Sequence, residues 1–420
     1  MMKTKLWKDA PLYFVAIFGS LSEAASIMTL LALSSSFLRV SPDGFASSAI
    51  QSMYYLGVGC IGFLGGGILQ KWSFVKVGMI GPIVSAVIVF LLACFDNVSP
   101  FIGLPSVFFI FLLTGIAHPN SLRFFNQFLP EHKKLSFFSL REGVTAILTI
   151  ASPVFASIFI AKYGTKTCFI IDGFTYLLSC LPWFLFRKNA VQSNHQEVKW
   201  LIGFQELIRN RAVRALTLSR LLNNIAYVFC TTAIPLIIAR LAHGNNDVFA
   251  FQQGSASSLL SFGFIAASII GTKIAKKNNV MIPMVYLASA LGLMAGILLI
   301  VSTVFLPLLY FSAVVLGIGT YCFRLSGMTL GQSFTPAPIL GPVIVAGDTV
   351  VRIWSFFISL ITLGLFEYCN FLNISFTPLI GLVLLFPSIC LIAPVWTRQL
   401  AKQFVYKNSS VLKEQHPAEE

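Results

Sequence analysis

The sequence predicts an all-α membrane protein that crosses the bilayer twelve times. Of its 420 residues, 56% are hydrophobic and only 10% are charged, and the mean hydropathy is +0.83. A soluble protein of this length would need far more charge to cover its surface. The apolar residues gather in stretches of about 20 or more, the length that an α-helix needs to cross a hydrocarbon core of about 30 Å. The spans of a β-barrel are about 10 residues long and alternate in polarity, so that architecture is excluded.

Short polar breaks divide the apolar stretches into twelve expected transmembrane helices. The first six cover residues 11–38, 45–69, 77–95, 104–128, 137–161 and 166–186. The second six cover residues 215–239, 249–271, 280–304, 306–330, 340–368 and 376–395. The polar tail that follows is expected to be disordered.

Lys and Arg residues are distributed unevenly between the two ends of the expected helices. An even number of spans places both termini on one side, and only four of the 29 basic residues fall on the other side: Arg39, Lys162, Lys166 and Arg240. Basic loops stay in the cytoplasm, so we expect a bacterial inner-membrane protein with both termini cytoplasmic. The same rule accounts for the net charge of +14, and we expect no nucleic-acid partner. The first apolar stretch is too long for a cleaved signal peptide and is expected to remain in the mature protein.

A long basic break divides the chain into two pseudo-repeated bundles of six helices. The expected domains are an N-terminal bundle (1–186), a cytoplasmic linker (187–214), a C-terminal bundle (215–396) and a cytoplasmic tail (397–420). Apolar residues recur at helical spacing within the linker and predict an amphipathic helix on the inner leaflet: Trp200, Leu201, Phe204, Leu207 and Ile208. The halves also share a pattern, because Gly66 and Gly271 each open a similar basic segment after the second span of their half. Repeated halves are typical of secondary transporters, whose substrate binds between them.

The six-plus-six arrangement and the loop after the second span resemble those of the major facilitator superfamily. That family carries the loop signature Gly-x-Leu-Ala-Asp-Arg-x-Gly-Arg. Gly66 and Lys71 match its first glycine and its arginine, whereas Gln70 and Ser73 replace the acid and the second glycine. The resemblance implies a loop that latches onto neighbouring helix ends, but the acid of an ionic latch is missing here.

Residues 120–215 resemble the enterobactin-exporter-like branch of that superfamily, which holds siderophore and drug exporters. The resemblance rests mainly on residues 128–135 (FLPEHKKL) and 171–176 (IDGFTY). The fifth span of this branch usually carries Gly-Pro followed by further glycines. Here Ser152-Pro153 is followed by Ala156 and Ser157, so small residues still permit close helix packing.

Glu23 lies about halfway along the first expected span, directly after Ser22. Ionisable residues inside a bilayer are costly and are functional candidates by default. A lone carboxyl there would suit a proton carrier, and the alternative is a carboxyl that holds the bundle together by hydrogen bonds to a neighbouring helix. Asn223 and Asn224 occupy the corresponding place in the seventh span, either as hydrogen-bonding partners of a substrate or as helix contacts.

Acid and base pairs open the fifth and eleventh spans, which occupy corresponding positions in the two halves. Arg141 and Glu142 form the first pair, and Asp348 and Arg352 form the second. Such pairs can act as gates that break when the halves rock. The alternative is a pair of static salt bridges at the membrane interface, because surface-proximal pairs contribute little energy.

Three further polar residues inside the spans allow two interpretations each. His118 could line a cavity or pack as a satisfied histidine, and Arg324 could meet an anionic substrate or extend to the inner surface. Asp172, near the outer end of the sixth span, is expected to cap or to pair there.

Motifs for other chemistry are missing from the sequence. It contains no phosphate-binding Gly-x-x-x-x-Gly-Lys-Ser/Thr, no Gly-x-Ser-x-Gly and no His-Glu-x-x-His, so we expect neither an enzyme nor ATP as the energy source. The eight cysteines are dispersed and form no Cys-x-x-Cys pair, so we expect no disulfide framework, metal site or cofactor.

Together these features predict a monomeric, proton-coupled exporter of a small amphiphile such as a siderophore or drug-like metabolite. Its partners would be that solute, protons and the lipid bilayer. An uptake symporter and a lipid or lysolipid flippase on the same fold are the alternatives, and an intramembrane enzyme is a further one from a different class.

Overall fold

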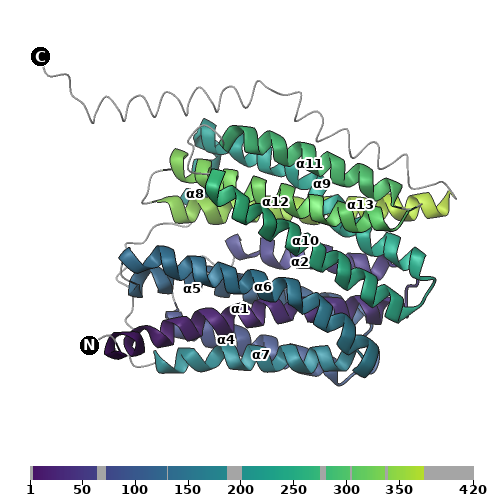
Figure 1. Ribbon diagram of the computed structural model, residues 1–420, viewed down its shortest axis with the longest axis horizontal. Coiled ribbons are helices and arrows are strands. Elements are labelled where there is room, and N and C mark those ends of the chain that lie inside the picture. Colours follow the sequence, from purple (N-terminus) through teal and green to yellow (C-terminus); the bar gives the residue numbers. More distant parts are fainter. Residues whose placement is uncertain are drawn as a thin grey trace, which may run out of the picture.

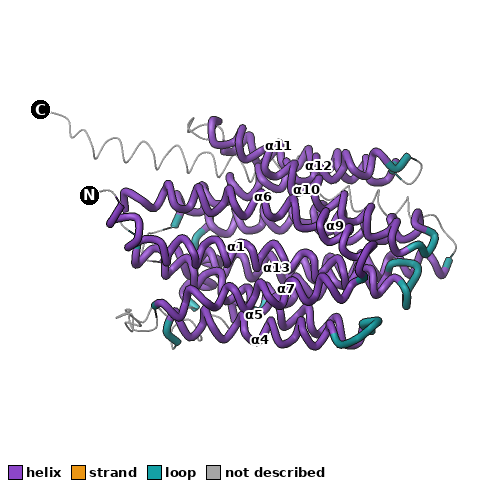
Figure 2. The backbone as a smooth tube through the Cα atoms, turned by 60° about the horizontal axis from the view of Figure 1, so that its bottom comes forward, coloured by secondary structure: helices purple, strands orange, loops and turns teal. Residues whose placement is uncertain are grey.

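The computed structural model describes residues 3–63, 72–129, 131–186, 201–274, 281–302, 305–335 and 339–372. Within these ranges the regular elements are α-helices (Figure 2). The predicted twelfth span, the tail, most of the linker and the loop residues Gly66, Gln70 and Lys71 lie outside the described residues.

Twelve helices occupy the described part of the chain, and the long ones run along the horizontal axis of Figure 1. They are α1 (Lys3–Leu38), α2 (Phe45–Gly59), α4 (Phe74–Ala93), α5 (Pro100–Phe128), α6 (Glu131–Tyr163), α7 (Thr165–Leu185), α8 (Ile202–Arg209), α9 (Arg211–Ala242), α10 (Asn246–Ile274), α11 (Met281–Val301), α12 (Pro307–Phe334) and α13 (Leu340–Phe371). All but the short α8 coincide with the first eleven predicted spans. Most of them extend past the predicted ends, because helical hydrogen bonding continues into polar flanks that hydropathy does not detect.

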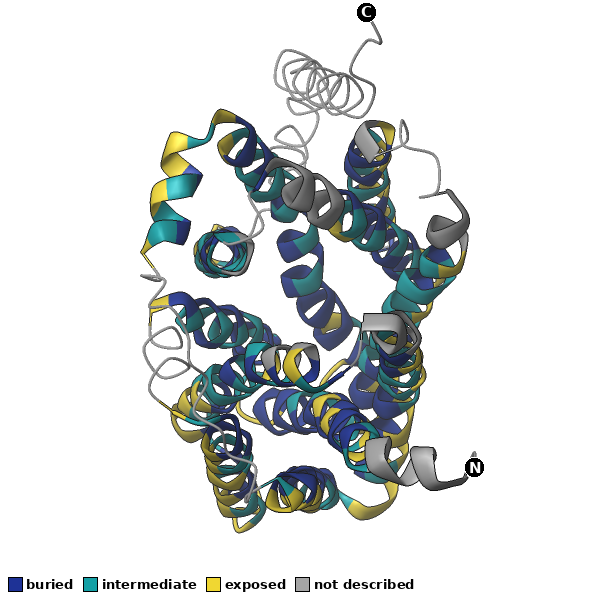
Figure 3. Cartoon of the chain, turned by 90° about the vertical axis from the view of Figure 1, so that its left-hand side faces the viewer, coloured by how far each residue is buried: buried dark blue, intermediate teal, exposed yellow. Residues whose placement is uncertain are grey.

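Length and composition make nine helices of the described chain able to cross a membrane. The distribution of exposed residues also suits a membrane protein, because they lie mainly on the periphery when the bundle is viewed end-on (Figure 3). Large apolar side chains such as Phe101, Ile147 and Leu185 are exposed, which suits contact with lipid. The chain is thus built as a multi-pass membrane protein.

Local sequence signals determine where several helices begin. The Ser73 hydroxyl accepts the backbone N–H of Lys76 at the start of α4, which gives this residue of the predicted loop motif a capping role. Asn210 accepts the backbone N–H groups of Ala212 and Val213 at the start of α9. Both side chains satisfy donors that have no partner within the first helical turn.

Helices α1, α2, α4, α5, α6 and α7 pack on one another and are called the N-terminal group below. Helix α1 lies against α2, α6 and α7, while α4 lies against α5 and α7. Their core contains wholly or almost wholly buried side chains from four different helices: Leu33, Phe37, Val89, Val107 and Phe169.

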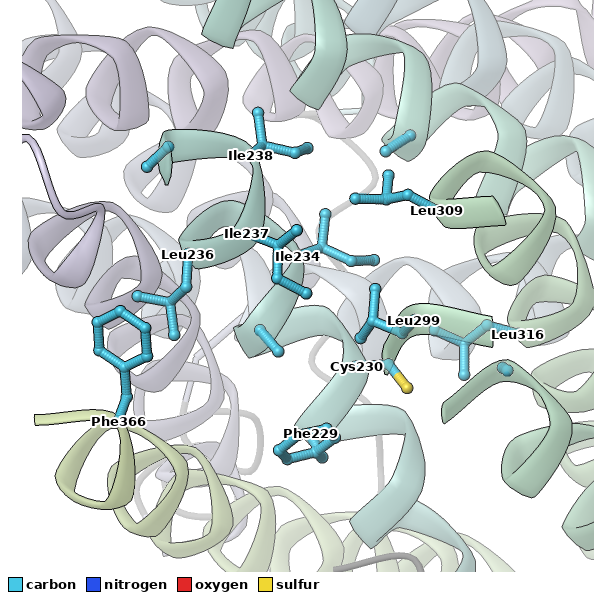
Figure 4. Close-up of a cluster of buried hydrophobic side chains, with 14 of the residues drawn as sticks. Phe229, Cys230, Ile234, Leu236, Ile237, Ile238, Leu299, Leu309, Leu316 and Phe366 are labelled. Atoms are coloured by element: carbon cyan, nitrogen blue, oxygen red, sulfur yellow. The ribbon is translucent and has the colours of Figure 1, made fainter. Parts of the chain in front are cut away.

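Helices α9, α10, α11, α12 and α13 form a second set of contacts, the C-terminal group, which lies above the first in Figure 1. Its centre is α9, whose apolar side chains meet those of α11, α12 and α13 (Figure 4). Phe229, Leu236 and Ile238 of α9 are buried together with Leu299 and Phe366 from neighbouring helices. Because α9 is apolar around most of its circumference, it occupies an interior position in the group.

The two groups meet along α2 with α13 and along α6 with α10. We call this interface the seam and define it by seven residues: Ser52, Gly62, Ile150, Gly254, Ser258, Thr349 and Ser359. Ser52 and Ser359 share a hydroxyl hydrogen bond of 2.8 Å, and Ser258 donates to the Ile150 carbonyl at 2.9 Å. Small residues and hydroxyl groups therefore bring the backbones of the two groups close together.

Gly62 provides the first test of the seam. A Cβ atom at this position would collide with the Thr349 side chain of α13. We expect Gly62→Ala to destabilise the protein by about 1–3 kcal/mol through overpacking, despite the higher helix propensity of alanine. Thermal unfolding of the purified protein in detergent measures this loss.

Gly19→Ala is the matched control, because nothing lies within 4 Å of a Cβ placed on Gly19 of α1. Its unfolding temperature should be unchanged or slightly raised. Equal unfolding temperatures for the two variants would contradict close packing at Gly62.

Candidate functional site

Seven ionisable side chains from five helices form a connected cluster that draws on both groups. The N-terminal group contributes His118 on α5 and Arg141 and Glu142 on α6; the C-terminal group contributes Arg220 on α9, Arg324 on α12 and Asp348 and Arg352 on α13. The charges that act on the His118 ring come from Arg141, Arg324, Glu142 and Asp348, so side chains of both groups face one another here. Four arginines against two acids leave this central cluster positively charged.

Arg141 and His118 are brought together by the packing of α6 against the rest of the N-terminal group. The Arg141 side chain is 8% exposed, and its Nη2 lies 3.4 Å from His118 Nδ1. A guanidinium has only donors, so Nδ1 must accept and the ring proton must sit on Nε2. The guanidinium also lies 5.9 Å from the centre of the Phe125 ring.

The predicted Arg141–Glu142 pair is marginal in the structure. Arg141 Nη1 and Glu142 Oε1 are 4.0 Å apart, and the Glu142 side chain is 63% exposed. Exposed pairs of this kind contribute little energy. Glu142 is therefore free to meet other charges in the central cluster.

Asp348 does not pair with Arg352, in contrast to the expectation from their spacing on one helix. It forms an ion pair with Arg220 of α9, a residue that the sequence interpretation missed. The sequence contains a signal that could have identified Arg220, because this charged residue lies inside an apolar stretch, as Asp348 does. This ion pair joins two helices of the C-terminal group and is partly exposed.

Arg352 reaches out of its own group to two tyrosines of α2. Its guanidinium carbon lies 5.6 Å from the Tyr54 ring centre and 5.8 Å from that of Tyr55. Tyr55 is completely buried, and its hydroxyl group shares a hydrogen bond with Thr231 of α9. Contacts between a cation and aromatic faces therefore join the two groups beside the seam.

Glu23 lies away from the hydroxyl groups that flank it in sequence. Its side chain is exposed and forms no hydrogen bond or ion pair within the part of the chain that the structure describes. Ser20 bonds Thr145 of α6 at 2.7 Å, and Ser26 bonds Tyr176 of α7 at 2.8 Å. Ser22 is buried, and its carbonyl accepts the Ser26 hydroxyl. Ser20 and Ser26 thus fasten α1 to its neighbours, while the Glu23 carboxyl group engages no other group of the described residues.

Asn223 and Asn224 lie in contacts between helices. The Ser289 hydroxyl of α11 donates to Asn223 Oδ1 at 2.5 Å, and Asn224 Nδ2 donates to Ser355 of α13. Both side chains thereby join α9 to its neighbours, which matches the packing alternative. Arg324 is exposed, with its guanidinium 5.8 Å from the Phe264 ring centre.

Asp172 is not a helix cap, because α7 begins at Thr165, seven residues earlier. It is fully buried between α1 and α7, where Thr29 donates to Oδ2 at 2.6 Å and Thr175 to Oδ1 at 3.3 Å. Its partners are hydroxyl groups from two helices, which hydropathy and spacing along one chain do not reveal.

The described residues contain no group of three or more His, Cys, Asp or Glu side chains able to hold a metal ion. The fold and the central cluster instead define a polytopic helical membrane protein with a polar interior between two packed groups. A comparison of the sequence with known families gives its class. The profile of the Major Facilitator Superfamily matches residues 12–359, and the chain belongs to this family.

One curated relative matches a limited part of the chain. It is an uncharacterized MFS-type transporter, YxaM, of Bacillus subtilis (strain 168), which is 29% identical over 98 residues. The match spans 23% of this chain and 24% of that relative. It supports the family but reveals no substrate.

Solved structures of the same architecture cover nearly the whole chain. A POT family transporter in complex with 5-aminolevulinic acid has a TM-score of 0.72 at 12% identity, over 93% of this chain and 96% of its own. The nucleoside transporter NupG has a TM-score of 0.65 at 13% identity, over 94% and 99%. At such low identity these similarities establish the fold alone. The finer resemblance to the enterobactin-exporter-like branch is not confirmed by these comparisons.

The Arg220–Asp348 ion pair is tested by a double-mutant cycle. Arg220→Gln and Asp348→Asn should each destabilise the protein, and the double variant should be no less stable than the worse single variant. We expect a coupling energy of about 0.5–1 kcal/mol, because the pair is partly exposed. Thermal unfolding at low and high salt gives this coupling, which should shrink as salt increases.

Asp247→Asn is the control for the cycle, because Asp247 is an exposed acid in the first turn of α10 and has no ion pair in the described part of the chain. Combined with Arg220→Gln it should give additive effects. Additive effects at Arg220 and Asp348 themselves would show that their contact carries no energy.

Proposed function

We propose that this protein is a secondary active transporter that moves a small amphiphilic solute across the bacterial inner membrane by alternating access. The observation that carries the proposal is the central cluster, which gathers charged side chains of both groups inside a helical bundle, with Arg352 of one group over Tyr54 and Tyr55 of the other. Intramembrane charges of this kind are characteristic of solute and ion pathways. Placing them between two groups allows one relative movement to change the access to all of them.

The contacts that close the seam are suited to such a movement. At the seam itself they consist of single hydroxyl hydrogen bonds and contacts of small residues, each of which contributes about 1 kcal/mol or less inside a membrane protein. A small apolar cluster beside the seam, in which Tyr55 of α2 meets Ile225, Val228 and Ile358, also joins the two groups. The two groups, in contrast, have large apolar cores of their own. This difference in packing supports the proposal that the two groups rock as two bodies.

Proton coupling, export of a siderophore or drug-like metabolite, a monomeric state and cytoplasmic termini complete the proposal. Export rests on the resemblance of residues 120–215 to exporters. Uptake by the same fold remains the second candidate, because the similarity in fold to solved transporters carries no information on direction. The solute gradient sets the direction of alternating access, so flux in inverted and right-side-out vesicles distinguishes the two.

The proposal is tested first by identifying the solute. Metabolites retained in cells with and without the gene should differ, and the differing compound should move into proteoliposomes that contain the protein. Relocation of an unchanged compound supports transport. Chemical conversion of that compound, or no movement of any differing compound, would refute the proposal.

Glu23 is our candidate for the proton carrier within this mechanism. Its carboxyl group is exposed halfway along a spanning helix and has no partner among the described residues, so a proton or solute can reach it. Coupling requires the two access states to differ in proton affinity. Glu23→Gln keeps the size and the hydrogen-bonding capacity but cannot titrate. We expect it to abolish accumulation driven by a pH gradient, with a loss of at least about tenfold in rate, while downhill exchange continues.

Asp247→Asn serves as the matched control, because it removes an exposed acid far along the chain at the start of α10. Uptake into proteoliposomes under an imposed pH gradient should remain at the wild-type level. If the Glu23→Gln protein still concentrates solute, another acid carries the proton, and Asp348 is the next candidate.

A further inference from the structure

Arg352 has no counter-ion, although it lies inside the bundle. Within the described residues its guanidinium takes part in no hydrogen bond and no ion pair. The acid one turn away on α13, Asp348, is engaged by Arg220 instead. Interior cations are normally paired because an isolated charge is costly to bury. Arg352 therefore presents a positive charge that the described chain does not neutralise.

The surroundings of Arg352 hold the cation without using its donors. Tyr54 and Tyr55 present their rings at 5.6 and 5.8 Å from the guanidinium carbon. Such contacts engage the π-faces of the rings, whereas the five N–H donors point outward in the plane of the guanidinium. Arg352 is partly exposed, and no hydrogen bond within the described residues occupies these donors, so they remain available to a small molecule.

Apolar and aromatic side chains from three helices complete the surroundings of Arg352. Tyr54 on α2, Tyr227 on α9 and Trp354 on α13 are partly buried against one apolar cluster beside the guanidinium. The nearby part of the central cluster adds Arg324 and the Arg220–Asp348 pair, and with four arginines against two acids the cluster keeps a net positive charge around Arg352. The positive electrostatic field around Arg352 favours the binding of an anion, and the surrounding aromatic side chains favour a ligand whose remaining part is apolar or aromatic.

We propose that Arg352 binds the anionic group of the transported solute, a carboxylate or a phosphate-type oxyanion, while Tyr54 and Tyr227 contact the apolar body of the solute. A planar guanidinium with free in-plane donors matches such an oxyanion through two parallel hydrogen bonds. This inference rests on the proposed transport function, and it restricts the substrate class to organic anions.

Binding is measured directly, so that the test does not depend on transport. The full chain is purified in detergent, and its unfolding temperature is recorded against increasing benzoate or phenyl phosphate, with neutral benzamide as the matched probe. We expect at least one anion to stabilise the wild-type protein and benzamide to have little effect. The anion with the lower half-saturating concentration shows whether the site prefers a carboxylate or a phosphate.

The variants identify the residue responsible. Arg352→Gln should raise the half-saturating concentration of the preferred anion at least about tenfold, since it removes both the charge and the donor pair. Arg352→Lys keeps the positive charge but lacks the planar guanidinium, so its half-saturating concentration should lie between those of the wild type and of Arg352→Gln. This variant preserves the test if Arg352→Gln does not fold. Arg240→Gln is the control, because Arg240 also lies over an aromatic ring, that of Phe366, but bonds Asn370 near the opposite end of α13.

Two results would overturn the inference: no stabilisation of the wild type by either anion, or equal anion binding by the wild type and both Arg352 variants. The second would assign Arg352 to a contact that only joins α2 to α13. Flux measurements separate this failure from that of the proposed function. If the solute moves across the membrane but anion binding does not depend on Arg352, only the anion site is refuted. If anion binding depends on Arg352 but no solute moves, only the transport function is refuted.

Discussion

The structure depends on the absence of water from the hydrocarbon core, which forces every backbone polar group to find its partner within the protein. Helices meet this demand within each segment, and hydroxyl side chains follow the same rule. Many donate to the carbonyl one turn earlier on their own helix: Thr145 to Arg141, Thr149 to Thr145, Thr320 to Leu316, Ser326 to Cys322 and Thr362 to Ile358. Other hydroxyls bridge helices, such as Ser20 with Thr145 and Ser52 with Ser359, and these few bridges help to determine which faces meet.

Charged groups in the interior are accommodated in several different ways. Arg220 and Asp348 neutralise one another, Arg141 is held by a histidine and a phenylalanine ring, and Arg352 is held by two tyrosine rings. Aromatic faces lower the cost of a buried cation without consuming its hydrogen-bond donors. An interior built this way retains unused donors between the two groups, where a solute would have to bind.

The seam and the cores of the two groups differ in their packing. Each group buries large side chains such as Phe169 or Phe229 in a continuous core. The seam relies on close packing at Gly62 against the Thr349 side chain and at Gly254 against the Pro153 backbone, and on hydroxyl contacts such as Ser52 with Ser359. Interfaces made of small contacts can be broken and remade at modest cost, whereas the cores cannot. The difference in packing thus supports two bodies that move as units.

The sequence by itself determined the membrane class, the family and the positions of eleven long helices, because hydrophobicity and helix length are local properties. It also identified most of the central cluster, since any charge within an apolar stretch is conspicuous. Only the tertiary structure decided which charges meet. Asp348 and Arg352 are one turn apart on α13, yet one pairs with α9 and the other with α2. Asp172 is buried among hydroxyl groups of α1 and α7 and is not a cap. Partner choice depends on how separate helices are rotated and packed against one another, and no pattern along a single helix contains that information.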